Sequence, residues 1–92
     1  MNDFDKEFGA MVLDVRRRKG LPRRDIAQEL EMHETTLRRI ELGDQEVKLY
    51  QAIALDELLG FGLDEFVATW RALLSKPPEE IVVRGRVYRL DA

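Results

Sequence analysis

The chain has 92 residues and a formal net charge of −3, with 45% hydrophobic and 36% charged residues. A chain of this length forms one domain, and its composition is that of a folded soluble protein rather than a disordered one. The absence of cysteine excludes disulfides, thiolate metal sites and cysteine nucleophiles. No apolar run reaches the ~20 residues that a membrane-spanning helix needs, and the acidic N-terminus lacks the pattern of a signal peptide. We therefore expect a cytoplasmic protein with no membrane partner.

The charged residues are unevenly distributed along the chain. Residues 15–24 carry six basic side chains and no acidic one, whereas residues 1–14 and 25–37 are net acidic. A protein with such a dipolar distribution can bind a polyanion through one face although its overall charge is negative. The net charge alone therefore leaves open both a nucleic-acid surface and an ordinary solvated one.

Apolar spacing predicts three helices in the first half of the chain, over about residues 5–19, 22–30 and 33–41. Gly20 is a natural end for the first helix, and Pro22 fits the first turn of the second. The positions expected to be buried are Phe8, Met11, Val12 and Val15, then Ile26, Ala27 and Leu30, then Leu37 and Ile40.

Two further helices and a β segment are expected in the second half. The helices cover about residues 48–59 and the segment after Gly62. Their inward positions are expected to be Leu49, Ala52, Ile53, Leu58 or Leu59, and then Leu63, Phe66, Val67, Trp70, Leu73 and Leu74. After Pro77-Pro78 the valine-rich tail forms either a hairpin turning at Arg84-Gly85 or one strand with a bulge at Gly85. We divide the chain into a helical domain, residues 1–75, and a β extension, residues 76–92.

The tight turn between the second and third helices is typical of a helix-turn-helix. Residues 8–67 resemble the Cro/C1-type (XRE) family of helix-turn-helix DNA-binding domains. The resemblance rests on Gly20-Leu21, Ile26-Ala27, Leu37, Ile40-Glu41, Gly43, Leu49, Leu59-Gly60 and Leu63-Asp64-Glu65-Phe66. Glu31 and His33 depart from it, because the family often has Gly at the first position and Ser or Thr at the second. The resemblance implies a mainly α fold, a five-helix lambda-repressor-like domain, here with a C-terminal β-strand or hairpin.

The resemblance also implies that the third helix enters the major groove of DNA and that residues near its start read bases. The base-reading residues would be Glu34, Thr35, Arg38 and Arg39. Contacts to phosphates would come from Arg16, Arg17, Lys19, Arg23, Arg24 and His33. Two alternatives stay open: Arg38 and Arg39 could form a solvated face paired with Glu34 or Glu41, and residues 16–19 could simply be a helix C-terminus that favours cations.

No constellation in the sequence indicates catalysis or a cofactor. His33 is the only histidine, so it cannot build a metal site alone. Thr35 and Thr36 have no general base or oxyanion arrangement behind them. No glycine-rich loop is present that would cradle a phosphate. We expect no enzyme activity, no metal and no cofactor.

The C-terminal third indicates association between two chains. The apolar stripe of the fifth helix is wider than one small core needs, and an isolated hairpin is marginal in water. The alternative for Trp70 is packing within its own domain. We expect a homodimer whose interface contains Phe66, Trp70, Leu73, Leu74, Ile81, Val83, Val87 and Tyr88.

Together these features predict a sequence-specific DNA-binding regulator, a dimeric repressor that reads a short palindrome in double-stranded DNA. The alternative hypothesis is a helix-turn-helix scaffold that has become a protein-interaction module, of the antitoxin or anti-repressor type. Its acidic residues would then contact a basic protein partner, and DNA binding would be weak or absent.

Overall fold

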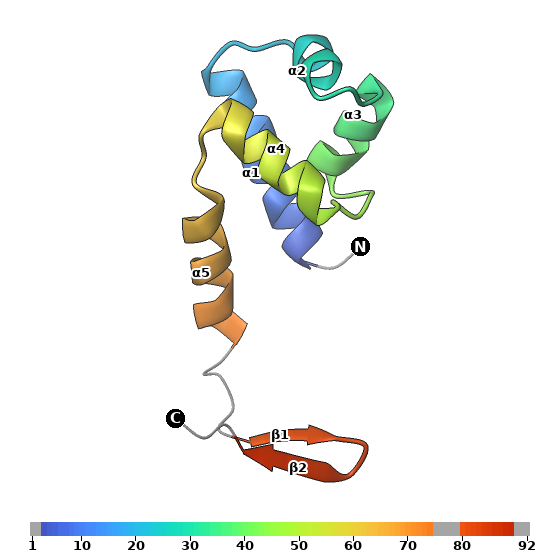
Figure 1. Cartoon of the computed structure of the whole chain (residues 1–92). Helices are drawn as coiled ribbons and strands as arrows, with labels where there is room; N and C mark the ends of the chain where they lie inside the picture. Colours follow the sequence, from blue (N-terminus) through green and yellow to red (C-terminus); the bar gives the residue numbers. More distant parts are fainter. Residues whose placement is uncertain (1–2, 75–79, 90–92) are drawn as a thin grey trace.

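The computed structural model describes residues 3–74 and 80–89, and in these ranges five helices precede a two-stranded antiparallel sheet (Figure 1). The elements are α1 Asp3–Arg18, α2 Arg23–Glu29, α3 Glu34–Leu42, α4 Leu49–Leu59, α5 Leu63–Leu74, β1 Glu80–Val83 and β2 Arg86–Arg89. The expected mainly α fold with a C-terminal hairpin is confirmed. The predicted stop at Pro77-Pro78 and the boundary between residues 75 and 76 lie outside the described residues.

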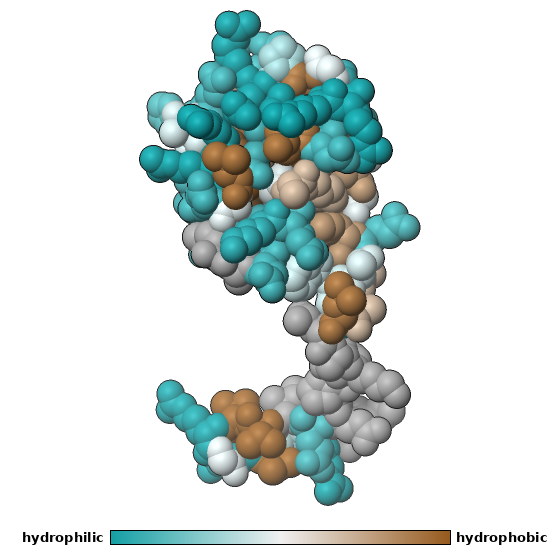
Figure 2. All heavy atoms as spheres, turned by 180° about the vertical axis from the view of Figure 1, so that it is seen from behind, coloured by the Kyte–Doolittle hydropathy of each residue, from teal (hydrophilic) through white to brown (hydrophobic). Residues whose placement is uncertain are grey.

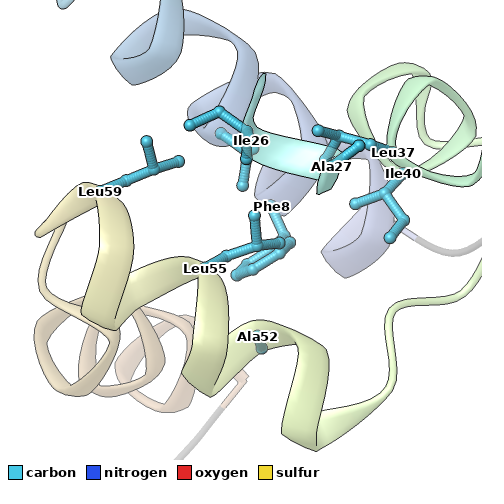
Figure 3. Close-up of a cluster of buried hydrophobic side chains, with 9 residues drawn as sticks. Phe8, Ile26, Ala27, Leu37, Ile40, Ala52, Leu55 and Leu59 are labelled. Carbon is cyan, nitrogen blue, oxygen red and sulfur yellow. The ribbon is translucent and has the colours of Figure 1, made fainter. Parts of the chain in front are cut away.

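The hydrophobic core lies where α1, α2, α3 and α4 meet. Figure 3 shows its side chains pointing toward one another from these four helices. The buried apolar residues are Phe8, Val12, Ile26, Ala27, Leu37, Ile40, Ala52, Leu55 and Leu59. Burying one of the larger of these side chains stabilises the fold by about 1.5–3 kcal/mol. The inward positions expected for the first three helices are confirmed, with Met11, Val15 and Leu30 partly buried at the edge of the core.

The backbones of α1 and α3 approach each other closely at Gly9. A Cβ atom at Gly9 would lie only 1.9 Å from the carbonyl oxygen of Ile40 and 3.0 Å from that of Glu41. Even a methyl group therefore does not fit between the two helices. This contact sets how closely α3 lies against the rest of the domain.

The face that α4 buries differs from the expected one. Ala52 and Leu59 are buried as predicted, but Leu55 takes the central place, and Leu49 and Ile53 are 74% and 45% exposed. The prediction for Leu49 and Ile53 was wrong because α4 carries apolar residues nearly all round its circumference. Periodicity then cannot decide which side faces the core.

Aromatic contacts attach α5 to the N-terminal helix. The ring of Phe66 lies 5.5 Å from Phe4 and 5.7 Å from Phe8, and the ring of Trp70 lies 5.4 Å from Phe4. Both rings thus pack within their own chain, because Phe4 supplies a surface that the pattern of α5 does not reveal. Both residues are only partly buried, and their place in an interface between two chains stays a prediction. Leu73 is 71% exposed, and the side chain of Leu74 lies outside what is described.

The tail forms a hairpin, which decides between the two predicted possibilities. Ile81 lies opposite Tyr88 and Val83 opposite Arg86. Arg84 and Gly85, with φ values of +51° and +79°, form the two-residue turn, as positive φ at both positions is typical of tight hairpin turns. The side chain of Ile81 is outside the description, while Val82, Val83, Val87 and Tyr88 are exposed. Figure 2 shows apolar residues gathered on the hairpin.

Candidate nucleic-acid interface

A left-handed residue makes the turn between α2 and α3. Glu31 has a φ of +53°, and the N–H of Met32 donates to the carbonyl of Ala27 over 2.9 Å, which closes the end of α2. This conformation costs a non-glycine residue roughly 1–2 kcal/mol. It explains why glycine is common at this position. His33 caps α3 without a side-chain hydrogen bond to the helix, so its imidazole is left free for another partner.

The two sides of α3 have different environments. Leu37, Ile40 and Glu41 are buried, and they hold the helix against the core. The predicted base-reading residues Glu34, Thr35, Arg38 and Arg39 are all exposed. Within residues 3–74 and 80–89, the side chains of Arg38 and Arg39 form no hydrogen bond or ion pair, so the pairing with Glu34 or Glu41 that was considered for them is not found there.

A hollow of about 520 Å³ lies on the exposed side of α3, lined by Arg23, Glu34, Thr35, Arg38 and Leu42. It brings Arg23, a predicted phosphate contact, beside three predicted base-reading residues. Leu42 was not predicted, although it follows Arg38 by four residues and Thr35 by seven, which places it on the same helical face. Its side chain is 55% exposed and could contact the methyl group of a thymine.

A buried carboxylate anchors the other side of this helix. Glu41 accepts hydrogen bonds from Arg16, whose Nε lies 2.6 Å from Oε2 and whose Nη2 lies 3.2 Å from Oε1. Arg23 donates from its Nε to Oε1 over 2.7 Å. The third nitrogen of Arg16 donates to the carbonyl of Leu21 over 2.9 Å. One carboxylate thus ties α3 to α1 and to the start of α2.

This arrangement corrects the role expected of Arg16. The residue is buried, and all three of its guanidinium nitrogens bind within the chain, so it cannot also hold a phosphate. Arg23 differs, because its side chain is 27% exposed and, among the described residues, only its Nε is engaged. Glu41 therefore holds Arg23 at the hollow, while the terminal nitrogens of Arg23 have no partner among the described residues.

A family model described as a helix-turn-helix domain matches residues 7–68. The chain belongs to this helix-turn-helix family. The match confirms the expected Cro/C1-like type and covers α1 from residue 7 onward, all of α2, α3 and α4, and the first half of α5. No curated protein and no solved structure matches the chain.

The remaining basic residues of the helix-turn-helix domain are not gathered at the hollow. Arg17, Lys19 and Arg24 are exposed. The ammonium group of Lys19 lies beside Gly60, at the turn between α4 and α5, and not beside α3. Arg24 pairs loosely with its neighbour Asp25 at 3.7 Å on the surface, a contact that contributes little in water. The structure thus separates Lys19 from the candidates on α2 and α3.

In residues 3–74 and 80–89 no group of three or more His, Asp or Glu side chains is placed to hold a metal ion. The helices described there include none that is long and apolar enough to cross a membrane.

Proposed function

We propose that this helix-turn-helix protein is a sequence-specific transcriptional regulator, a dimeric repressor that places α3 in the major groove of a short palindrome. It would act in the cytoplasm, where it meets DNA. The observation that carries the proposal is the exposed side of α3, where Thr35 and Arg38 line one hollow with Arg23. The side chains of Thr35 and Arg38, and of the exposed Arg39, have no hydrogen-bond partner among the described residues. To read bases, a helix must be held in place by its buried side and must present hydrogen-bond donors on its exposed side.

The roles within this surface follow from the chemistry of each group. Arg38 can form two hydrogen bonds with guanine, Thr35 can contact thymine, and Glu34 can accept a hydrogen bond from the amino group of cytosine. Arg23, Arg24 and His33 at the starts of α2 and α3 are suited to phosphates, which position the protein without reading sequence. Arg39 can contact either a base or a phosphate.

Fluorescence anisotropy tests the proposal, with the DNA upstream of the protein's own gene as the probe and a scrambled duplex as competitor. We expect tight binding at 50 mM salt that weakens about 10³-fold at 200 mM, because phosphate contacts release counterions. Arg38→Ala should reduce the preference over scrambled DNA by about 1–3 kcal/mol. Arg18→Ala is the control, since Arg18 pairs with Asp14 on α1 and lies outside the proposed reading surface; it should preserve the preference.

Two outcomes would contradict this function. If neither duplex binds at 50 mM salt, the acidic residues around α3 dominate, and the chain acts as a protein-interaction module. If binding is tight but Arg38→Ala, alone or with Arg39→Ala, leaves the preference for the upstream DNA over the scrambled duplex unchanged, then α3 does not read the bases.

The dimer is proposed to include the hairpin, whose apolar side chains are exposed in the single chain. Joining two hairpins through their open strand edges would pair backbone groups and cover these side chains. A chain ending at residue 76 is therefore expected to dissociate at least tenfold more readily than the full chain in sedimentation equilibrium. Circular dichroism serves as the control, because none of the core residues that the structure describes belongs to the hairpin and the helices should persist. A truncated chain that dimerises as tightly as the full one would exclude the hairpin from the interface.

A further inference from the structure

The hairpin of β1 and β2 carries an unbalanced positive charge at its turn. Residues 80–89 contain three arginines and one acid, a net charge of +2. The acid, Glu80, lies opposite Arg89 at the open end of the hairpin and accepts a hydrogen bond from its Nε over 3.2 Å. Arg84 in the turn and Arg86 just after it are exposed. Their side chains have no hydrogen-bond or ion-pair partner among the described residues, so the charge at the turn is free.

Arg84 has a backbone conformation that is unfavourable for arginine. Its φ of +51° lies in the left-handed region, and the first position of such a two-residue turn is usually asparagine, aspartate or glycine. A positive φ costs a residue with a side-chain Cβ free energy, and residues held in this way cluster at functional sites. The exposed side chain of Arg84 gains no packing within the chain in return. This combination points to a contact with another molecule.

The turn is open to an approaching surface. It lies at the free end of the hairpin (Figure 1), and a Cβ atom at Gly85 would meet no other atom within 4 Å. Joining two hairpins through their strand edges, as in the proposed dimer, would leave the turn uncovered, because the turn is not part of an edge. The hairpin therefore presents two arginines on either side of a residue that has no side chain.

We propose that the turn of the hairpin places Arg84 and Arg86 in the minor groove of DNA, where the duplex is rich in A·T pairs. This inference rests on the proposed DNA binding and adds a second contact to that of α3. The minor groove is about 6 Å wide. Two paired strands, whose backbones alone lie about 4.8 Å apart, do not fit into it with their side chains, whereas single arginine side chains at a turn do.

The preference for A·T pairs follows from the shape and chemistry of the groove. Runs of A·T pairs narrow the minor groove and strengthen its negative potential, which attracts arginine. Adenine and thymine also present only hydrogen-bond acceptors there, whereas guanine adds an amino group that is a donor. A guanidinium group has donors alone, so it matches A·T pairs and meets an unfavourable neighbour at G·C pairs.

Two duplexes that differ only in the minor groove test the proposal. One consists of G·C pairs alone, and the other has hypoxanthine in place of every guanine. Hypoxanthine is guanine without the amino group, so it keeps the groups of the major groove and resembles an A·T pair in the minor groove. In fluorescence anisotropy at low salt, the full chain is expected to bind the hypoxanthine duplex about fivefold more tightly or better, which is the smaller effect of one favourable base contact.

Variants of the hairpin assign this preference to its turn. Arg84→Asn removes the guanidinium but keeps a residue that the turn favours, and Arg86→Gln removes the second one. Each should lower the preference for hypoxanthine, and the two together should abolish it. Arg89→Gln is the matched control, since it removes one arginine from the same hairpin, but one that is paired with Glu80; the preference should remain. Sedimentation equilibrium checks that the variants associate as the wild type does.

The outcomes separate this inference from the reading of bases by α3. If the wild type binds both duplexes equally, the minor-groove contact is overturned, while loss of the preference for upstream DNA in Arg38→Ala would still support the proposed function. If the double variant weakens binding to both duplexes by the same factor, or keeps the full preference, the contact of Arg84 and Arg86 with the groove is overturned. If neither these duplexes nor the upstream DNA bind, the proposed function fails together with this inference.

Discussion

Replacing Glu41 by leucine is expected to lower the free energy of unfolding by about 3–5 kcal/mol. The substitution removes the carboxylate that accepts from Arg16 and Arg23, and it leaves the buried guanidinium of Arg16 without a counter-charge. The cost of such a change comes mainly from the charge that remains, because an unpaired ion is strongly disfavoured away from water. Urea denaturation followed by circular dichroism measures the loss.

Two controls show whether the buried charge is the cause. Arg16→Met together with Glu41→Leu should recover much of the lost stability, because replacing a whole buried ion pair by apolar groups is often close to neutral. Asp14→Ala breaks the exposed pair with Arg18 and should cost only about 0–1 kcal/mol. A Glu41→Leu variant that loses no more than Asp14→Ala would contradict the anchoring role of Glu41.

Gly9→Ala is expected to destabilise the domain by about 1–3 kcal/mol or more and to weaken operator binding beyond what the unfolded fraction explains. A methyl group at Gly9 cannot coexist with the carbonyl oxygen of Ile40 at 1.9 Å, so α1 and α3 must separate. Alanine is the better helix former by about 1 kcal/mol, and a net loss must therefore come from this contact. Since α3 carries the proposed reading residues, its displacement should also disturb their fit to DNA.

Urea denaturation and anisotropy on the same samples check this result. Ala10→Leu is the control, because Ala10 is the exposed neighbour of Gly9 on α1 and has room for a larger side chain. Unchanged stability and unchanged DNA affinity in Gly9→Ala would mean that the two helices can move apart without consequence for α3.

The sequence predicted the helices best where apolar and polar faces alternate clearly. Phe8 and Val12 in α1, and Leu37 and Ile40 in α3, stand out from polar neighbours, and all four are in the core. In α4 the apolar residues surround the helix, so spacing could not distinguish the buried Leu55 from the exposed Leu49. Only the packing of α4 on its neighbours makes that choice.

The roles of charged residues were harder to predict, because they depend on partners distant in sequence. Arg16 and Glu41 lie 25 residues apart, so nothing in the sequence shows that they pair, although Arg16 follows Val12 by four residues and therefore lies on the buried face of α1. The contacts of Phe66 and Trp70 with Phe4 were not predicted for a similar reason, since Phe4 comes from the other end of the domain. The exposed side of α3 was easier to predict. A residue that does not share a helical face with Leu37 and Ile40 points to solvent, whichever surface those two residues pack against.

The small size of α2 and α3 makes the reading surface depend on the whole domain. They have 7 and 9 residues, and isolated helices shorter than about 12–15 residues are marginal in water. The arrangement of Arg23, Thr35 and Arg38 therefore exists only while the core is intact, and the proposed DNA binding is linked to the folding equilibrium. Under the proposed function, a core substitution that touches no base would lower DNA binding by unfolding the domain, and bound DNA would in turn stabilise a weakened fold.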